Sequence, residues 1–212
     1  MPKHTEEFSI SHKLLPVRWS DANDDTWEGY EEISVETSIC LYDEDQGVYR
    51  KAALSKGYVL YPERALHQCG MNPYILFDII DSEVWGFYAD CELQNVFDIV
   101  LPERVVVISQ VGVNPIYRNR TPDIGLSVVK SWVSNLSVGE TLFLMLPDAI
   151  NRTEGKLASW FHFGKVPSHK RRVDHPEEVL ARYWQKAGFK IWPGTPHMYL
   201  AGEKVQEAIN NL

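Results

Sequence analysis

The chain has 212 residues, of which 44% are hydrophobic and 24% charged, and its formal net charge at pH 7 is -8. This length and composition predict one domain, residues 1–212, with a substantial core, and the acidic balance disfavours binding to nucleic acid. The sequence has no apolar run long enough to cross a membrane and no apolar signal core near its N-terminus, so we expect a soluble, cytoplasmic protein without membrane partners.

The first part of the chain predicts a polar extension followed by a β-hairpin. Residues 1–30 are polar, and SDANDDTWEG within them is typical of a loop, preceded by a terminus expected to fray. Residues 33–42 alternate apolar and polar side chains, and DEDQG then supplies turn residues before a second apolar segment at 49–61. This pattern indicates two antiparallel strands joined by a turn.

The next apolar segment has two interpretations. Ile80, Val84 and Cys91 follow helical spacing, and Asp81 or Ser82 could cap the start, which predicts a helix over residues 82–94. A strand running from Val84 to Leu93 is the alternative, because short apolar runs do not settle the period.

Residues 104–136 predict a strand, a turn and a helix in direct succession. The run RVVVIS from Arg104 is typical of a strand covered on both faces. Apolar residues at Ile124, Val128, Trp132 and Leu136 recur every four positions and predict an amphipathic helix. A strand that ends in a turn and feeds a helix leaves several backbone N–H groups aimed at one point. This arrangement predicts an anion site suited to phosphate.

The last third of the chain predicts a helix at 177–187 that is stopped by Gly188. A long segment at 151–175 precedes this helix. Its aromatic residues Trp160, Phe161 and Phe163 either wall a substrate pocket or seal the segment against the core.

The cysteines and histidines do not predict a metal centre. Cys40, Cys69 and Cys91 lack the CxxC spacing of a thiolate site, and their odd number argues against a disulfide framework. The histidines form no HEXXH motif and no i, i+4 ligand pair on a recognisable helix. We therefore expect buried thiols and no metal.

A family resemblance rests on two motifs. Val113, Pro115, Tyr117 and Arg118 form V-x-P-x-Y-R ahead of Gly125, which resembles the acetyl-CoA pyrophosphate loop of the GNAT N-acetyltransferase superfamily. RYWQKAGFK at 182–190 and the following HMYLA at 197–201 are similar to the family's late helix and last strand. LFLMLPDA at 142–149 lies where the family places its fifth strand. The resemblance covers about residues 100–201, with 31–99 as a variable N-terminal half and 202–212 as a C-terminal tail. It implies an α/β fold with a mixed central sheet flanked by helices.

The resemblance also implies an activity, the transfer of an acetyl group from acetyl-CoA to the amine of a small molecule or peptide by direct attack. Acetyl-CoA would be the co-substrate, and a homodimer is possible. The positions implied to contact the cofactor are Val111, Gly112 and Val113 for the pantetheine arm, Arg118, Asn119, Arg120, Ile124 and Gly125 for the pyrophosphate, and Trp184 on the late helix. The basic stretch at 165–175 is either a solvated loop or a clamp for the coenzyme A 3′-phosphate or an acidic substrate.

The catalytic assignments come from the same resemblance. Trp184 stands where many family members carry the tyrosine that protonates the leaving thiolate, so the adjacent Tyr183 is the candidate general acid. Glu103, at the start of the fourth strand, is the candidate general base. Each has a purely structural alternative, a packed tyrosine and a solvated glutamate.

Two departures from the family pattern support an alternative function. Asp123 occupies the place of the first glycine of the loop, or else Thr-Pro is inserted before it. Asp123 could cap the following helix, but its carboxylate would repel a diphosphate unless an arginine lies between them. With Trp184 as the second departure, the alternative is a catalytically inactive GNAT-like module that binds CoA or another protein.

Overall fold

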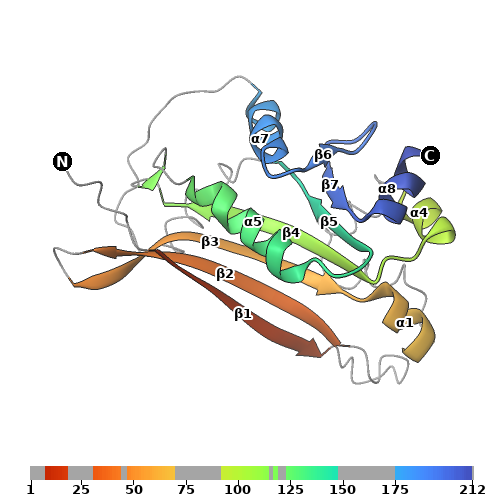
Figure 1. Cartoon of the computed structure of the whole chain (residues 1–212), viewed down its shortest axis with the longest axis horizontal. Coiled ribbons are helices and arrows are strands. Elements are labelled where there is room, and N and C mark those ends of the chain that lie inside the picture. The colour runs from red at the N-terminus through yellow and green to blue at the C-terminus, as the bar shows by residue number, and fades with distance from the viewer. Residues whose placement is uncertain are drawn as a thin grey trace.

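The computed structural model describes residues 8–18, 31–43, 47–69, 92–114, 117–118, 123–147 and 175–211. Within them the chain forms a mixed sheet flanked by helices, in the strand order β1-β2-β3-β4-β5-β7-β6 (Figure 1). The strands are β1 (Phe8–Arg18), β2 (Glu31–Asp43), β3 (Val48–Leu60), β4 (Arg104–Val113), β5 (Thr141–Met145), β6 (Lys190–Ile191) and β7 (Met198–Ala201). The helices are α1 (Pro62–Cys69), α4 (Leu93–Ile99), α5 (Ile124–Leu136), α7 (Pro176–Gln185) and α8 (Glu203–Asn210). The predicted α/β class is confirmed.

The sheet contains one parallel pair among the described strands. β4 and β5 run parallel, from Arg104 opposite Thr141 to Ile108 opposite Met145, and the other neighbouring strands pair antiparallel. A parallel pair needs a crossover connection, and α5 supplies it. α5 lies across β2, β3 and β4, so the helix covers one face of the sheet in its middle (Figure 1).

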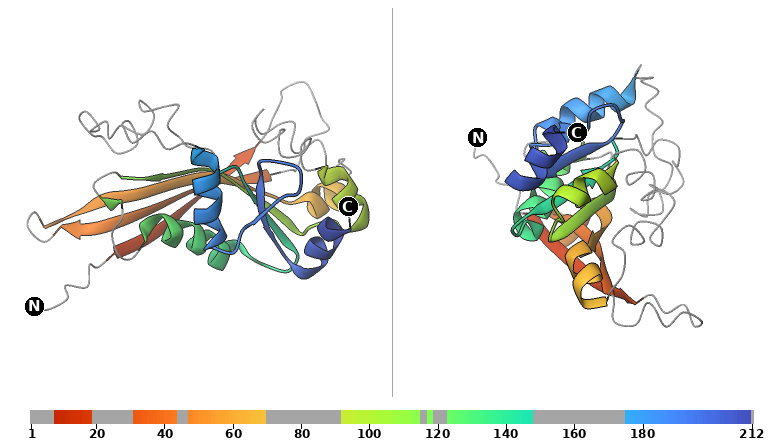
Figure 2. Two further views of the ribbon diagram at one scale, coloured as in Figure 1. Left: turned by 90° about the horizontal axis from the view of Figure 1, so that it is seen from above. Right: turned by 90° about the vertical axis from the view of Figure 1, so that its right-hand side faces the viewer.

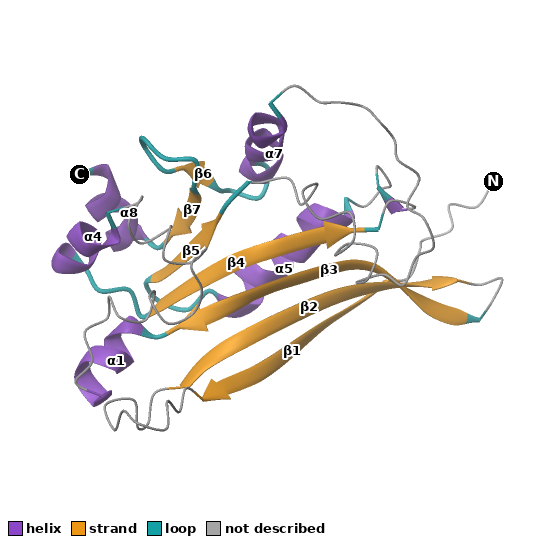
Figure 3. Cartoon of the chain, turned by 180° about the vertical axis from the view of Figure 1, so that it is seen from behind, coloured by secondary structure: helices purple, strands orange, loops and turns teal. Residues whose placement is uncertain are grey.

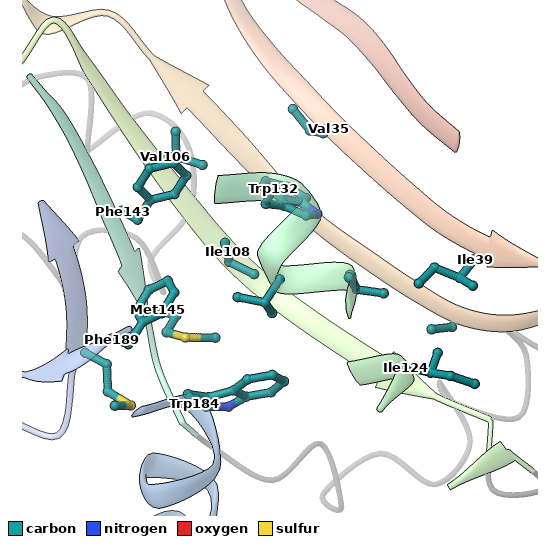
Figure 4. Close-up of a cluster of buried hydrophobic side chains, with 14 of the residues drawn as sticks. Val35, Ile39, Val106, Ile108, Ile124, Trp132, Phe143, Met145, Trp184 and Phe189 are labelled. Atoms are coloured by element: carbon teal, nitrogen blue, oxygen red, sulfur yellow. The ribbon is translucent and has the colours of Figure 1, made fainter. Parts of the chain in front are cut away.

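β4 is the central strand of the core, and both of its faces are covered. Val106 and Ile108 pack in a cluster under α5, which Figure 4 shows together with Trp132 and Phe143. On the opposite face, Val105 and Val107 pack in a second cluster with residues of α4 and α8, two helices that lie together at one end of the molecule (Figure 2). The prediction of a strand buried on both faces is confirmed.

The hairpin predicted in the N-terminal half is confirmed as β2 and β3, but the polar extension before it is only partly correct. Residues 8–18 form β1, which pairs along its whole length with β2. The strand includes His12, whose Nδ1 lies 2.8 Å from Thr37 Oγ1 and whose Nε2 lies 2.8 Å from Ser131 Oγ on α5. A fraying terminus is therefore the wrong description of residues 8–18, because this histidine ties the strand to both β2 and α5.

The C-terminal tail expected at 202–212 also requires correction. Residues 203–210 form α8, and its Val205, Ala208 and Ile209 are buried in the cluster beside β4. Spacings of three and one residues place these side chains on one helical face. The segment is therefore part of the core.

The remaining predicted elements agree in type and differ at their ends. The helices predicted to begin near Ile124 and Glu177 are α5 and α7, and the last strand is β7. β5 ends at Met145, before the predicted limit, and Pro147 has no N–H to continue a ladder. A helix was predicted at 82–94, with a strand as the alternative. Residues 82–91 of this segment lie outside the described residues, and α4 begins at Leu93. No helix in the described ranges is both long and apolar enough to span a membrane.

Candidate functional site

β4 has two neighbouring strands in its first half and one, β3, among the described strands in its second half. The β4–β5 ladder ends at Ile108 opposite Met145, and the β3–β4 register shifts between Lys56 and Gly57, so that Ser109 is an extra residue on β4. Such a bulge bends a strand and increases its twist. Figure 3 shows β4 and β5 starting side by side and then diverging. In the described ladders, the second half of β4 pairs with β3 alone.

The diverging half of β4 contains Val111, Gly112 and Val113, the positions expected to contact a pantetheine arm. They pair with Ser55, Leu54 and Ala53 of β3. In the described part of the sheet, no strand pairs with the other side of this half. Main-chain N–H and C=O groups on that side are therefore oriented to pair with an extended ligand.

Hydrogen bonds hold the described residues that follow β4, residues 114 and 117–118. The side chain of Asn114 is buried, its backbone N–H donates to the carbonyl oxygen of Ala52 at 2.9 Å, and its Nδ2 donates to that of Lys51 at 3.3 Å. Arg118 is exposed, and its Nε donates to the carbonyl oxygen of Val113 at 3.2 Å. The guanidinium therefore lies at the open end of β4. Asn119 and Arg120, the other expected phosphate contacts, lie outside the described residues.

The N-terminus of α5 is capped by Asp123, as predicted. Its Oδ1 accepts a hydrogen bond from the backbone N–H of Leu126 at 3.3 Å, and its carbonyl oxygen accepts from the Ser127 backbone N–H at 2.9 Å. The cap also has a second donor, because the Tyr183 hydroxyl on α7 donates to the same Oδ1. This contact joins two helices whose residues lie 60 positions apart.

Gly125 is the point where β4, α5 and α7 meet. A Cβ added at this residue would lie 2.4 Å from the Tyr183 hydroxyl oxygen and 3.3 Å from Cγ2 of Val113. Any larger residue would displace the Tyr183 hydroxyl from its place against α5. The structure thus brings together four of the predicted site positions: Val113, Ile124, Gly125 and Tyr183.

Tyr183 is poorly suited to be a general acid in this arrangement. Burial is the main cause that raises the pKa of its hydroxyl well above the ordinary range, and the hydrogen bond and negative charge of Asp123 add to it, against a smaller opposing effect of the Leu126 backbone. A phenol with a raised pKa gives up its proton less readily, and this proton is already shared with a carboxylate. The structure favours the structural alternative for Tyr183.

Trp184 and Glu103 do not lie at the edge of β4 that contains Val111 to Val113. The side chain of Trp184 is buried in the cluster under α5, near Met145 and Phe189 (Figure 4). Glu103 precedes β4, where its backbone N–H donates to the carbonyl oxygen of Glu140 at 3.1 Å. At roughly 3.3 Å per residue, about 25 Å of strand separates Glu103 from Val111. The structure does not bring the candidate general base to the candidate site.

The bulge was not predicted, although the sequence carries a signal for it. Gly57 inside an otherwise regular strand is a common sign of a bulge in the neighbouring pairing. A turn after β4 was predicted, but the contribution of Asn114, which precedes a proline as is typical of turns, was not. The basic stretch at 165–174 and the aromatic residues at 160–163 lie outside the described residues. Among those that are described, no group of three or more His, Cys, Asp or Glu residues is placed to hold a metal ion.

Comparison of the chain with protein-family models, with curated proteins and with solved structures found no match.

Proposed function

We propose that this chain is an acyl-CoA-dependent N-acetyltransferase of the GNAT type, which transfers an acetyl group to the amine of a small molecule or peptide. One observation carries the proposal. The second half of β4, which among the described strands pairs with β3 alone, ends beside Arg118, and the chain then enters the N-terminus of α5 at Asp123. An extended arm and an anionic group joined to it would meet complementary groups in that order.

The strand arrangement gives further support. A strand that separates from its neighbour offers main-chain groups to an extended ligand, and β4 and β5 separate after Ile108 and Met145. The pantetheine arm would pair with the main chain from Val111 towards Val113, whose carbonyl oxygen accepts from Arg118 Nε, and the terminal guanidinium nitrogens of Arg118 would give charge-assisted hydrogen bonds to the diphosphate. A main-chain N–H near the bulge would polarise the thioester carbonyl.

The transfer itself would proceed by direct attack. The nitrogen of a neutral amine forms a bond to the carbonyl carbon of the thioester, the carbon–sulfur bond breaks, and sulfur leaves as thiolate. One proton then leaves the nitrogen and one is taken up by the sulfur. Since Tyr183 donates to Asp123 and Glu103 lies at the far end of β4, we propose that water carries these protons.

A second candidate is a CoA-binding module without turnover. It is favoured by the same pair of observations that removes the side-chain acid and base: the Tyr183 hydroxyl donates to Asp123, and Glu103 lies at the far end of β4. Both candidates need the same binding site, and they differ in whether an acetyl group is released to an amine.

The test is calorimetric titration with acetyl-CoA and with CoA, followed by a thiol-release assay across a panel of amines. Arg118→Ala should weaken binding roughly tenfold or more, the effect of losing a charge-assisted contact to phosphate. Arg64→Ala removes the same charge from an exposed position on α1, at the far end of the molecule (Figure 1), and should leave the affinity unchanged. Binding with amine-dependent thiol release supports the enzyme, and binding without release supports the module. The absence of binding at millimolar CoA contradicts both.

A further inference from the structure

The N-terminus of α5 already holds an anion that belongs to the chain. The Asp123 carboxylate oxygen Oδ1 accepts from the Leu126 backbone N–H at 3.3 Å and from the Tyr183 hydroxyl. Free N–H groups at the start of a helix are the donors that a phosphate uses. In this structure one of them is taken by a carboxylate, and a second donor from α7 holds that carboxylate in place.

The position of Tyr183 makes the cap a steric obstacle as well. The Tyr183 hydroxyl oxygen lies so close to Gly125 that a Cβ there would be 2.4 Å from it. The phenol therefore lies directly against the first turn of α5, next to the end of β4. A diphosphate that approached the helix from β4 would meet this hydroxyl and the carboxylate behind it.

We infer that Asp123 and Tyr183 form an internal cap that competes with the diphosphate of an acyl-CoA for the N-terminus of α5. The inference rests on the proposed function, whose binding site it regulates. For the diphosphate to bind, the Tyr183 hydroxyl must leave Asp123 and the carboxylate must turn away, or two like charges must lie side by side. The cap acts on the diphosphate and leaves the pantetheine positions on β4 unaffected.

The inference can be tested with Asp123→Asn, which removes the negative charge and keeps a side chain that can cap α5. Asparagine is as good an N-cap as aspartate, and its side-chain oxygen can still accept from Leu126 and Tyr183. The variant should bind CoA about fivefold tighter or more, since a like charge roughly 4 Å away in water-like surroundings costs about that factor. Pantetheine, which lacks the diphosphate, should bind the variant and the wild type equally.

The matched control is Glu203→Gln. Glu203 is an exposed carboxylate in the first turn of α8, so its neutralisation changes the net charge by the same amount at another helix start. The Glu203→Gln variant should bind CoA with the affinity of the wild type. A gain in both variants would assign the effect to net charge and overturn the inference.

Titrations with CoA, pantetheine and inorganic pyrophosphate distinguish the remaining outcomes. Equal CoA affinity of wild type and Asp123→Asn overturns the internal cap and leaves the proposed function standing. Pyrophosphate binding that tightens in Asp123→Asn, with no CoA binding in either protein, supports the cap and contradicts the proposed function. No binding of either ligand to either protein overturns both.

Discussion

Gly57 on β3 lies where the sheet has no room for a side chain, so Gly57→Ala should destabilise the protein strongly. An added Cβ would lie 2.0 Å from the Val107 carbonyl oxygen and 2.9 Å from Cη2 of Trp132. Carbon and oxygen normally approach no closer than about 3.3 Å, so the two strands would have to separate by roughly 1.3 Å. Val107 cannot move freely, because it pairs with Tyr58 on one side and Leu144 on the other.

The expected loss of stability has two sources, overpacking of the site and weakening of a backbone hydrogen bond. Overpacking a tight core site costs about 1–3 kcal/mol, and weakening a buried backbone hydrogen bond adds about 1–3 kcal/mol. We expect Gly57→Ala to lower the free energy of unfolding by about 3–5 kcal/mol, measured by urea denaturation with an unchanged slope.

Gly194→Ala is the control for the alanine substitution itself. Gly194 has a φ of +75°, and no atom lies within 4 Å of its added Cβ, so only backbone strain of about 1–2 kcal/mol should appear. If Gly57→Ala costs no more than Gly194→Ala, the close approach of β3 and β4 at the bulge is refuted.

Three further predictions concern other parts of the molecule. Burial lowers the pKa of His12, so the folded state binds its proton less readily than the unfolded state; the stability that His12 contributes is complete above the ordinary histidine pKa of about 6.5 and is lost as pH falls below it. His12→Gln should make the urea midpoint depend less on pH between pH 7 and pH 5. A pH dependence equal to that of the wild type would contradict the assignment. Glu103→Gln should change the CoA affinity and any thiol release less than twofold, whereas a loss above tenfold would restore Glu103 as a base. Val205→Ala should lower the free energy of unfolding by about 2 kcal/mol, because this side chain of α8 is fully buried, and the exposed Glu207→Ala on the same helix should change it by less than about 0.5 kcal/mol.

The parts of the fold that the sequence predicted are those with strong local periodicity. The apolar run from Val105 to Ile108 and the four-residue spacing from Ile124 to Leu136 each identify an element without knowledge of its neighbours. The cap at Asp123 was predictable for the same reason, since an N-cap lies directly before the helix that it serves. Local rules therefore located the start of α5, the part of the candidate site nearest to β4.

The parts that were missed depend on contacts between distant residues. β1 carries the polar side chain of His12 between apolar residues, and only the packing of β2 and α5 gives that side chain partners in Thr37 and Ser131. The pairing of Tyr183 with Asp123 crosses 60 positions, which no local pattern contains. The family resemblance, for its part, drew attention to Trp184, one helical step of about 100° away from the residue that meets α5.

The bulge at Ser109 divides β4 into two halves with different roles. Before it, Val105 to Ile108 are buried on both faces and paired on both edges, so this half anchors the sheet. After it, the strand keeps β3 but leaves β5, and its end reaches Gly125 and the cap formed by Asp123 and Tyr183. A ligand at this end would therefore add hydrogen bonds to a strand that is already held in position. In the proposed binding mode, the cost of binding would lie in displacing the cap, because the strand itself would need little ordering.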